Sequence, residues 1–132
     1  MYEMKDEYLT GIEFIDAEHT KLFEIADRLY EVMKNDFIHD KYDYILEVVN
    51  ELREYTQYHF SHEEDYMKSI NYKKLLSHMV EHHEFIEKLD NFDLGSIDHN
   101  QQQTLFQLLE FLSDWLIHHI CDKDKLISLH ND

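Results

Sequence analysis

The chain contains no proline and only two glycines among its 132 residues. Proline and glycine interrupt helices and supply tight turns, so their scarcity predicts long, uninterrupted helices and argues against a sheet protein. At 43% hydrophobic and 14% aromatic, the chain also holds enough apolar mass to close one core. We therefore expect residues 1–132 to form a single domain.

Apolar residues recur at three- and four-residue spacing in four stretches, as on one face of a helix. They predict helices over about residues 15–34, 41–68, 71–90 and 100–121, after an N-terminal arm of residues 1–14. Ser69 and Asn71 are suited to cap the start of the third helix, and residues 93–98 have the composition of a loop. Helices of this length with short connections favour an all-α fold, an antiparallel up-and-down four-helix bundle.

The charge of the chain excludes several classes of function. Twelve Lys and Arg against 29 Asp and Glu give a formal charge of −17, so we expect no nucleic-acid partner and no attraction to an anionic membrane surface. No apolar run approaches the roughly 20 residues that a membrane span needs. Cys121 is alone and cannot form an internal disulfide, and the first residues lack a secretory signal. A cytoplasmic protein is the expectation, and no protein partner is indicated.

Each predicted helix carries a histidine or a carboxylate where its periodicity favours an apolar residue. These residues are His19 in the first helix, His59 and Glu63 in the second, His78 and His82 in the third, and His119 in the fourth. A buried imidazole or carboxylate without a partner costs several kcal/mol. Polar groups at core positions of all four helices therefore predict one shared partner.

The spacing of these residues fits a metal as that partner. Residues four apart share one stripe of a helix, which holds for His59 with Glu63 and for His78 with His82. Neutral imidazoles and carboxylates together suit iron, manganese or zinc, whereas a lone thiol argues against a soft-metal site. Five inward histidines with carboxylates exceed what one tetrahedral ion can use, so two ions are predicted.

Four blocks of sequence carry a resemblance to a known family. They are IDAEHTKL at 15–22, HFSHEE at 59–64, HMVEHHEF at 78–85, and WLIHHI at 115–120 with Asp124 beyond it. In the order and spacing of these blocks, residues 11 to about 127 resemble the hemerythrin family, in its single-domain bacterial form, the bacteriohemerythrins. The resemblance implies two non-haem iron ions, bridged by an oxo or hydroxo group, with dioxygen as their ligand.

The resemblance also implies a role for each ligand position. His78, His82 and His119 bind one iron, and His19 and His59 bind the other. Glu63 and Asp124 bridge the pair. Counting ligands then leaves one position open on the iron with two histidines, where dioxygen is expected to bind. Six apolar residues are placed to form the wall of this oxygen pocket: Phe23, Phe60, Phe85, Trp115, Leu116 and Ile120.

Several assignments near the bridge stay open. Asp124 lies five residues after His119, about 140° around an ideal helix, so the helix must end or loosen between them. Asp122 competes with Asp124 for the bridge, and Glu64 competes with Glu63.

Two further sets of residues lie outside the ligand positions. Glu18 stands beside His19, where relatives more often carry a neutral glutamine. A charge at this position puts in question the second layer around the metal, which is formed by the residues that contact its ligands. Six other histidines fall outside the core stripe and are predicted to be solvated: His39, His62, His83, His99, His118 and His130.

The expected function is reversible dioxygen binding, for storage, delivery or sensing, without catalytic residues. The alternatives are a diiron enzyme that reduces oxygen, peroxide or nitric oxide, and iron storage. Ferritin-like oxidases carry Glu-x-x-His pairs, and no such pair occurs in this chain. Its absence makes the oxidase hypothesis the weaker one.

Overall fold

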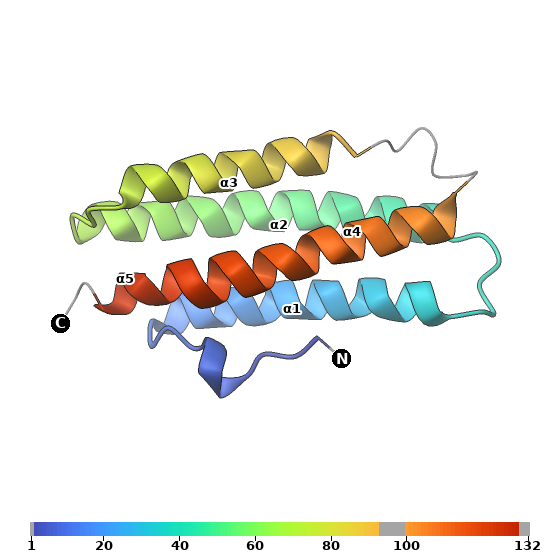
Figure 1. Ribbon diagram of the computed structural model, residues 1–132, viewed down its shortest axis with the longest axis horizontal. Coiled ribbons are helices and arrows are strands. Elements are labelled where there is room, and N and C mark those ends of the chain that lie inside the picture. Colours follow the sequence, from blue (N-terminus) through green and yellow to red (C-terminus); the bar gives the residue numbers. More distant parts are fainter. Residues whose placement is uncertain (1, 93–99, 130–132) are drawn as a thin grey trace.

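The computed structural model describes residues 2–92 and 100–129, with the side chains of all of these except 121, 122, 128 and 129. Within this part of the chain the fold is all-α and contains no strand (Figure 1). The helices are α1 (Glu13–Lys34), α2 (Tyr42–Ser69), α3 (Leu75–Asp90), α4 (Gln101–Trp115) and α5 (Lys125–Leu129). A π-helical segment, Leu116–Asp124, joins α4 to α5, and a short 3-10 helix, Asp6–Tyr8, lies in the N-terminal arm. The loop predicted at 93–98, His99 and His130 lie outside the described residues.

Four helical rods lie side by side, and successive rods run in opposite directions (Figure 1). α4, the π-helical segment and α5 continue one another as the fourth rod. α1 packs against both α2 and α4, and α2 packs against α3. The predicted up-and-down four-helix bundle is confirmed.

Two apolar clusters fill the interior. The larger one includes the fully buried Leu29, Leu52 and Leu108. The smaller one, Met67 with Tyr72 and Ile127, closes the end of the bundle where α2 turns into α3. The polar residues of the predicted metal site lie toward the smaller cluster, and Phe60 and Ile120 of the larger cluster directly follow His59 and His119 in the chain.

The turn between α2 and α3 corrects the predicted start of the third helix. α3 begins at Leu75, not at residue 71, and its first residue follows Lys74, which makes no side-chain cap. Asn71 instead ends α2: its φ is 55°, its N–H donates to the carbonyl of Lys68, and the N–H of Tyr72 donates to the carbonyl of Met67. This pair of bonds is the Schellman pattern, in which a left-handed residue satisfies the last carbonyls of a helix.

The fourth rod extends beyond its predicted end near residue 121. Helical backbone continues through the π-helical segment and α5 to Leu129. Ile127 is fully buried in the smaller apolar cluster. This contact holds the end of the rod against the bundle, because burial of an apolar side chain favours the helical extension that allows it.

The N-terminal arm lies along α1 (Figure 1). Tyr8 stacks on Phe23 of α1, with ring centroids 5.4 Å apart and planes inclined by 2°. Gly11 has a φ of 85°, a conformation that favours glycine. The Asp16 carboxylate accepts hydrogen bonds from the backbone N–H groups of Thr10 and Gly11, at 2.8 and 3.1 Å, which fixes how the arm enters α1.

Two Leu→Ala substitutions test the bundle core. Leu52 is fully buried in α2, so Leu52→Ala should lower the free energy of unfolding of the metal-free protein by about 2–5 kcal/mol, the usual cost of a core cavity. Leu76→Ala on α3 is the matched control, because its side chain is 74% exposed and should change that free energy by under about 0.5 kcal/mol. Denaturant unfolding measures both, and equal effects would contradict the packing described above.

Candidate metal centre

Seven polar side chains from all four rods meet between the two apolar clusters. They are His19 on α1, His59 and Glu63 on α2, His78 and His82 on α3, and His119 and Asp124 in the π-helical segment. All are buried, and the most exposed of them, His119, is only 5% exposed. These are the seven positions predicted from the sequence to bind metal, and the structure brings every one of them together.

The seven side chains form two groups that share Glu63 and Asp124. In the group with two histidines, His19 Nε2 lies 3.1 Å from Asp124 Oδ2 and 3.7 Å from Glu63 Oε2. His59 Nε2 lies 3.2 Å from the same Glu63 oxygen. Within each group, one potential ligand atom per residue lies within 4.8 Å of all the others.

The second group has three histidines. His82 Nε2 lies 3.1 Å from Glu63 Oε1, and His119 Nε2 lies 3.3 Å from Asp124 Oδ1. His78 Nδ1 lies 3.4 Å from the same Asp124 oxygen. Neighbouring ligands of an octahedral ion with bonds of about 2.1 Å stand about 3 Å apart. The nitrogen-to-oxygen distances in both groups are therefore close to those of ligands around one ion.

Each carboxylate divides its two oxygens between the groups. Glu63 turns Oε2 toward His19 and His59, and turns Oε1 toward His82. Asp124 likewise turns Oδ2 toward His19 and Oδ1 toward His119. A carboxylate arranged in this way can bind two ions at once, one through each oxygen.

The π-helical segment explains how Asp124 reaches the centre. Hydrogen bonds between residues i and i+5 widen a π-helix, so residues five apart come to lie on one face. His119 and Asp124 are five apart and both fall within Leu116–Asp124. The helix loosens between them, as the sequence required.

Of the two residues that compete for the bridging role, the structure describes the side chain of Glu64 but not that of Asp122. The Glu64 carboxylate faces outward from the centre, where Oε2 accepts a hydrogen bond from His82 Nδ1 at 2.8 Å. Glu63, not Glu64, therefore stands between the two groups. The side chain of Asp122 lies outside the described residues.

Unsatisfied atoms indicate that the centre suits metal ions. Eight buried atoms of six of its residues have no hydrogen-bond partner among the described residues: both ring nitrogens of His19, His59 Nε2, Glu63 Oε2, His78 Nδ1, His119 Nε2 and both Asp124 oxygens. A buried polar atom without a partner costs about 1–3 kcal/mol. Seven of these eight face the other residues of their group, the exception being His19 Nδ1, so coordination would satisfy seven with one or two ions.

The protonation of the metal-free centre follows from its internal contacts. Burial disfavours the charged form of His59, but the hydrogen bond to Glu18 and the nearby Glu63 carboxylate outweigh it and raise the pKa of His59 to about 10. Contacts with Asp124 likewise outweigh burial and raise the pKa of His19 and of His119. Despite burial, the surrounding imidazoles hold the pKa of Glu63 well below its usual range. Metal ions must therefore displace protons when they bind.

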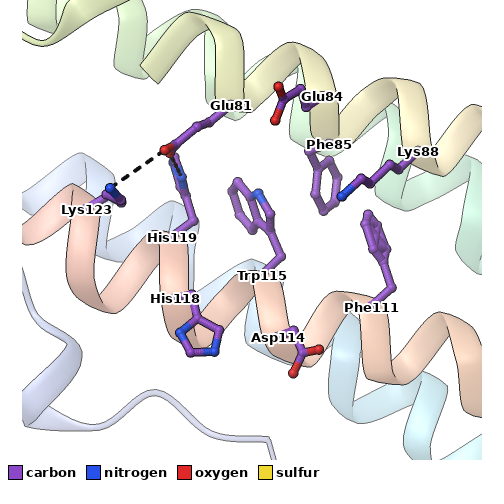
Figure 2. Close-up of a pocket in the computed structure, with 10 residues that line it drawn as sticks. All are labelled: Glu81, Glu84, Phe85, Lys88, Phe111, Asp114, Trp115, His118, His119 and Lys123. Atoms are coloured by element: carbon purple, nitrogen blue, oxygen red, sulfur yellow. Dashed lines mark ion pairs between the residues drawn. The ribbon is translucent and has the colours of Figure 1, made fainter. Parts of the chain in front are cut away.

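A second layer of carboxylates surrounds the centre, and of its members the sequence pointed only to Glu18. Glu18 accepts from His59 Nδ1 at 2.7 Å, and Glu64 accepts from His82 Nδ1 as described. Figure 2 shows the third, Glu81 of α3, whose Oε2 lies 2.6 Å from His119 Nδ1. Such outer partners fix the orientation of a ligand ring and make it a stronger donor. All three are next to ligand residues in sequence, but their contacts depend on how the helices pack.

The six residues predicted to wall an oxygen pocket fall into two sets. Phe60 stacks on His82 with ring centroids 4.0 Å apart, and Trp115 stacks on His119 at 4.4 Å. Phe85 contacts both of these aromatic rings. The other three residues, Phe23, Leu116 and Ile120, are buried in the larger apolar cluster. A groove of about 440 Å³ between α3 and the fourth rod reaches Trp115 and His119 from outside (Figure 2).

His62 is exposed, as predicted for a solvated surface residue, but it also has a partner that the sequence did not indicate. Its side chain is 45% exposed, but its Nδ1 bonds to Glu18 Oε2 at 2.8 Å. His83 does have the expected surface character, because its side chain is 80% exposed.

Comparison with known proteins points to one family. The model of the hemerythrin HHE cation binding domain matches residues 10–128. A bacteriohemerythrin of Clostridium acetobutylicum is 48% identical over 125 residues, which cover 95% of this chain and 97% of the relative. A bacteriohemerythrin of Pseudomonas aeruginosa is 28% identical, covering 91% of this chain and 74% of the relative. One of Methylococcus capsulatus is 27% identical, covering 91% and 88%.

Acid–base measurements test the electrostatics of the centre. Because the folded-state pKa of His59 is about 10, above its ordinary value of 6.5, its protonation stabilises the metal-free fold fully below about pH 6.5. This contribution is lost as the pH rises toward 10, whereas that of Glu63 is lost only in acid. The unfolding free energy of the metal-free protein should therefore fall by about 1 kcal/mol per pH unit between pH 7 and 10.

The protein loaded anaerobically with ferrous iron is the control for that measurement. It carries the same surface charges, but its imidazoles are neutral ligands and have no proton to lose. Its stability should fall less steeply over the same range. Parallel pH profiles for the two forms would contradict the assigned protonation.

Proposed function

The chain belongs to the hemerythrin family, and on that premise we propose that it binds dioxygen reversibly at a non-haem diiron centre. Members of this family bind dioxygen, and the relatives compared above are named bacteriohemerythrins. In this proposal the seven side chains of the centre hold two iron ions, joined by the two carboxylates and by an oxo or hydroxo bridge. Storage, delivery and sensing of oxygen would all use such a site.

One observation carries the proposal: the two groups share their carboxylates but differ by one histidine. Glu63 and Asp124 contribute one oxygen to each group. Three imidazoles complete one group and two complete the other. The group of His19 and His59 therefore has one protein ligand fewer, which leaves room for an external ligand on that side.

The remaining chemistry requires a dry, rigid site. When bound, a diiron pair supplies two electrons and a coordination position for dioxygen. The protein's own part is to orient the imidazoles and to exclude water, which would otherwise assist irreversible oxidation. Phe60 and Trp115 stack on His82 and His119, two rings of the three-histidine group, and Leu116 is 1% exposed. These contacts support the exclusion of water from the centre, and the role of the six apolar residues as walls of an oxygen pocket stays a prediction.

The proposal makes the protein a carrier and not an enzyme. Oxygen binding is the property of the family, and the chain has no Glu-x-x-His pair of the kind found in ferritin-like oxidases. No contact in the described residues favours iron storage over oxygen binding. Oxygen, peroxide or nitric oxide reduction is the alternative that the first experiment below tests.

The location of the protein rests on the sequence alone. Among the described residues, none of the helices has the length and apolar character that a membrane crossing demands. A cytoplasmic location stays a prediction.

An oxygen cycle tests the proposed function. The iron-loaded protein is reduced without oxygen, exposed to oxygen and then flushed with inert gas while its visible spectrum is followed. We expect the colourless reduced form to return over repeated cycles, because the site releases the ligand that it binds. A single irreversible change accompanied by free peroxide would overturn the proposal and indicate turnover.

Iron content tests the ligand assignment. His59→Ala and Glu63→Gln should each lower the iron bound per chain from its expected value of about two, because each removes a donor from the centre. His83→Ala is the matched control, since that histidine lies 80% exposed on α3. Circular dichroism confirms that the variants remain helical. Equal iron loss in all three variants would refute the assignment.

A further inference from the structure

Glu18 differs from the other outer carboxylates because both of its oxygens are bound by imidazoles. Oε1 accepts from His59 Nδ1 at 2.7 Å, and Oε2 accepts from His62 Nδ1 at 2.8 Å. The Glu18 residue is 8% exposed and its bond to His59 is buried, whereas its bond to His62 is partly buried. A charge-assisted bond in such surroundings is stronger than one at the surface.

His62 is contacted by two aromatic rings and by the Glu18 carboxylate. Its ring lies 4.2 Å from the Tyr58 ring and 6.2 Å from the Phe14 ring, centroid to centroid. It also follows His59 by three residues on α2, so the two rings project from neighbouring positions of one helix face. Glu18, which comes from α1, therefore links two imidazoles of α2 across the helix interface.

The outer carboxylates of the other group are more exposed, and each contacts one imidazole. Among the described residues Glu64 bonds to His82, and its side chain is 20% exposed. Glu81 contacts His119 and, at 3.8 Å, Lys123, and its side chain is 33% exposed. In the two-histidine group, by contrast, His19 Nδ1 is buried and has no hydrogen-bond partner among the described residues. The orientation of that group therefore depends on a single outer carboxylate, Glu18.

We infer that Glu18 and His62 are positioning residues that set how tightly the subsite of His19 and His59 holds its metal ion. The inference rests on the metal centre of the proposed function, but it does not require that the centre bind oxygen. The bond to Glu18 fixes the proton of His59 on Nδ1 and turns Nε2 toward Glu63. His62 occupies the second Glu18 oxygen and so keeps the carboxylate from turning away from His59.

Substitutions at His62 separate this role from general damage to the fold. His62→Ala removes the bond to Glu18, whereas His62→Asn places an amide N–H donor where Nδ1 stood. Ferrous iron is titrated anaerobically against a chelator of known affinity. We expect His62→Ala to bind one of its two ions about 10–100-fold more weakly, the usual effect of losing an outer partner, and His62→Asn to recover most of this loss.

A substitution at Glu18 tests the charge. Glu18→Gln keeps an acceptor for His59 but removes the negative charge, so it should retain both ions and shift the reduction potential of the centre upward. A role limited to joining α1 to α2 would leave that potential unchanged. Mössbauer spectra of the reduced protein give an independent signature, in which the signal of one iron changes in His62→Ala and the other is preserved.

Two controls complete the experiment. Glu81→Gln perturbs the partner of His119 and should affect the other iron signal, while His83→Ala should affect neither. The inference is overturned if His62→Ala binds both ions as the wild type does, or if both are weakened equally and His62→Asn gives no recovery. A wild-type protein that binds fewer than two irons would instead defeat the proposed diiron function.

Discussion

Two fully buried carboxylates set the terms for the whole structure. Glu63 and Asp124 are 0% exposed and lie at the middle of the bundle, where charge without a partner is costly. Imidazoles from every rod surround the two carboxylates and offset that cost. The four helices must therefore meet at one level and in one register. A bundle core made only of leucines would tolerate sliding of one helix along another, but shared ligands do not.

The same demand shapes the apolar core. Because the polar centre crosses the full width of the bundle, it divides the interior into a large cluster and a small one. Among the described residues, the buried members of the small cluster are Met67, Tyr72 and Ile127, with partly buried neighbours around them. This cluster gains stability from the turn that Asn71 makes and from the extension of the fourth rod into α5. The turn at Asn71 and the extension into α5 thus close the end of the bundle that lies beyond the seven polar side chains.

Helix periodicity predicted the fold and most of the buried polar residues of the centre, and its limits are physical. Residues such as His59 and Glu63 repeat at four-residue spacing, so one face is visible from sequence alone. Periodicity assumes ideal helices, however, and the π-helical segment breaks that assumption at Asp124. It also ignores contacts between helices, which is why the partnership of Glu18 with His62 could not be predicted. The prediction that Asn71 caps the start of the third helix was wrong, because the residue types that cap the start of one helix can also end another.

The uneven distribution of outer carboxylates matches the uneven distribution of histidines. Two outer carboxylates hold two of the three rings in one group, so no single contact decides the geometry there. In the other group one carboxylate holds one of two rings, and it is the most buried and the most fully bonded of the three. The most buried outer carboxylate therefore lies beside the group with fewer histidines. If the proposed iron pair has a vacant position in that group, a ring that moved beside it would let water bind there, and the Glu18 contact would oppose this.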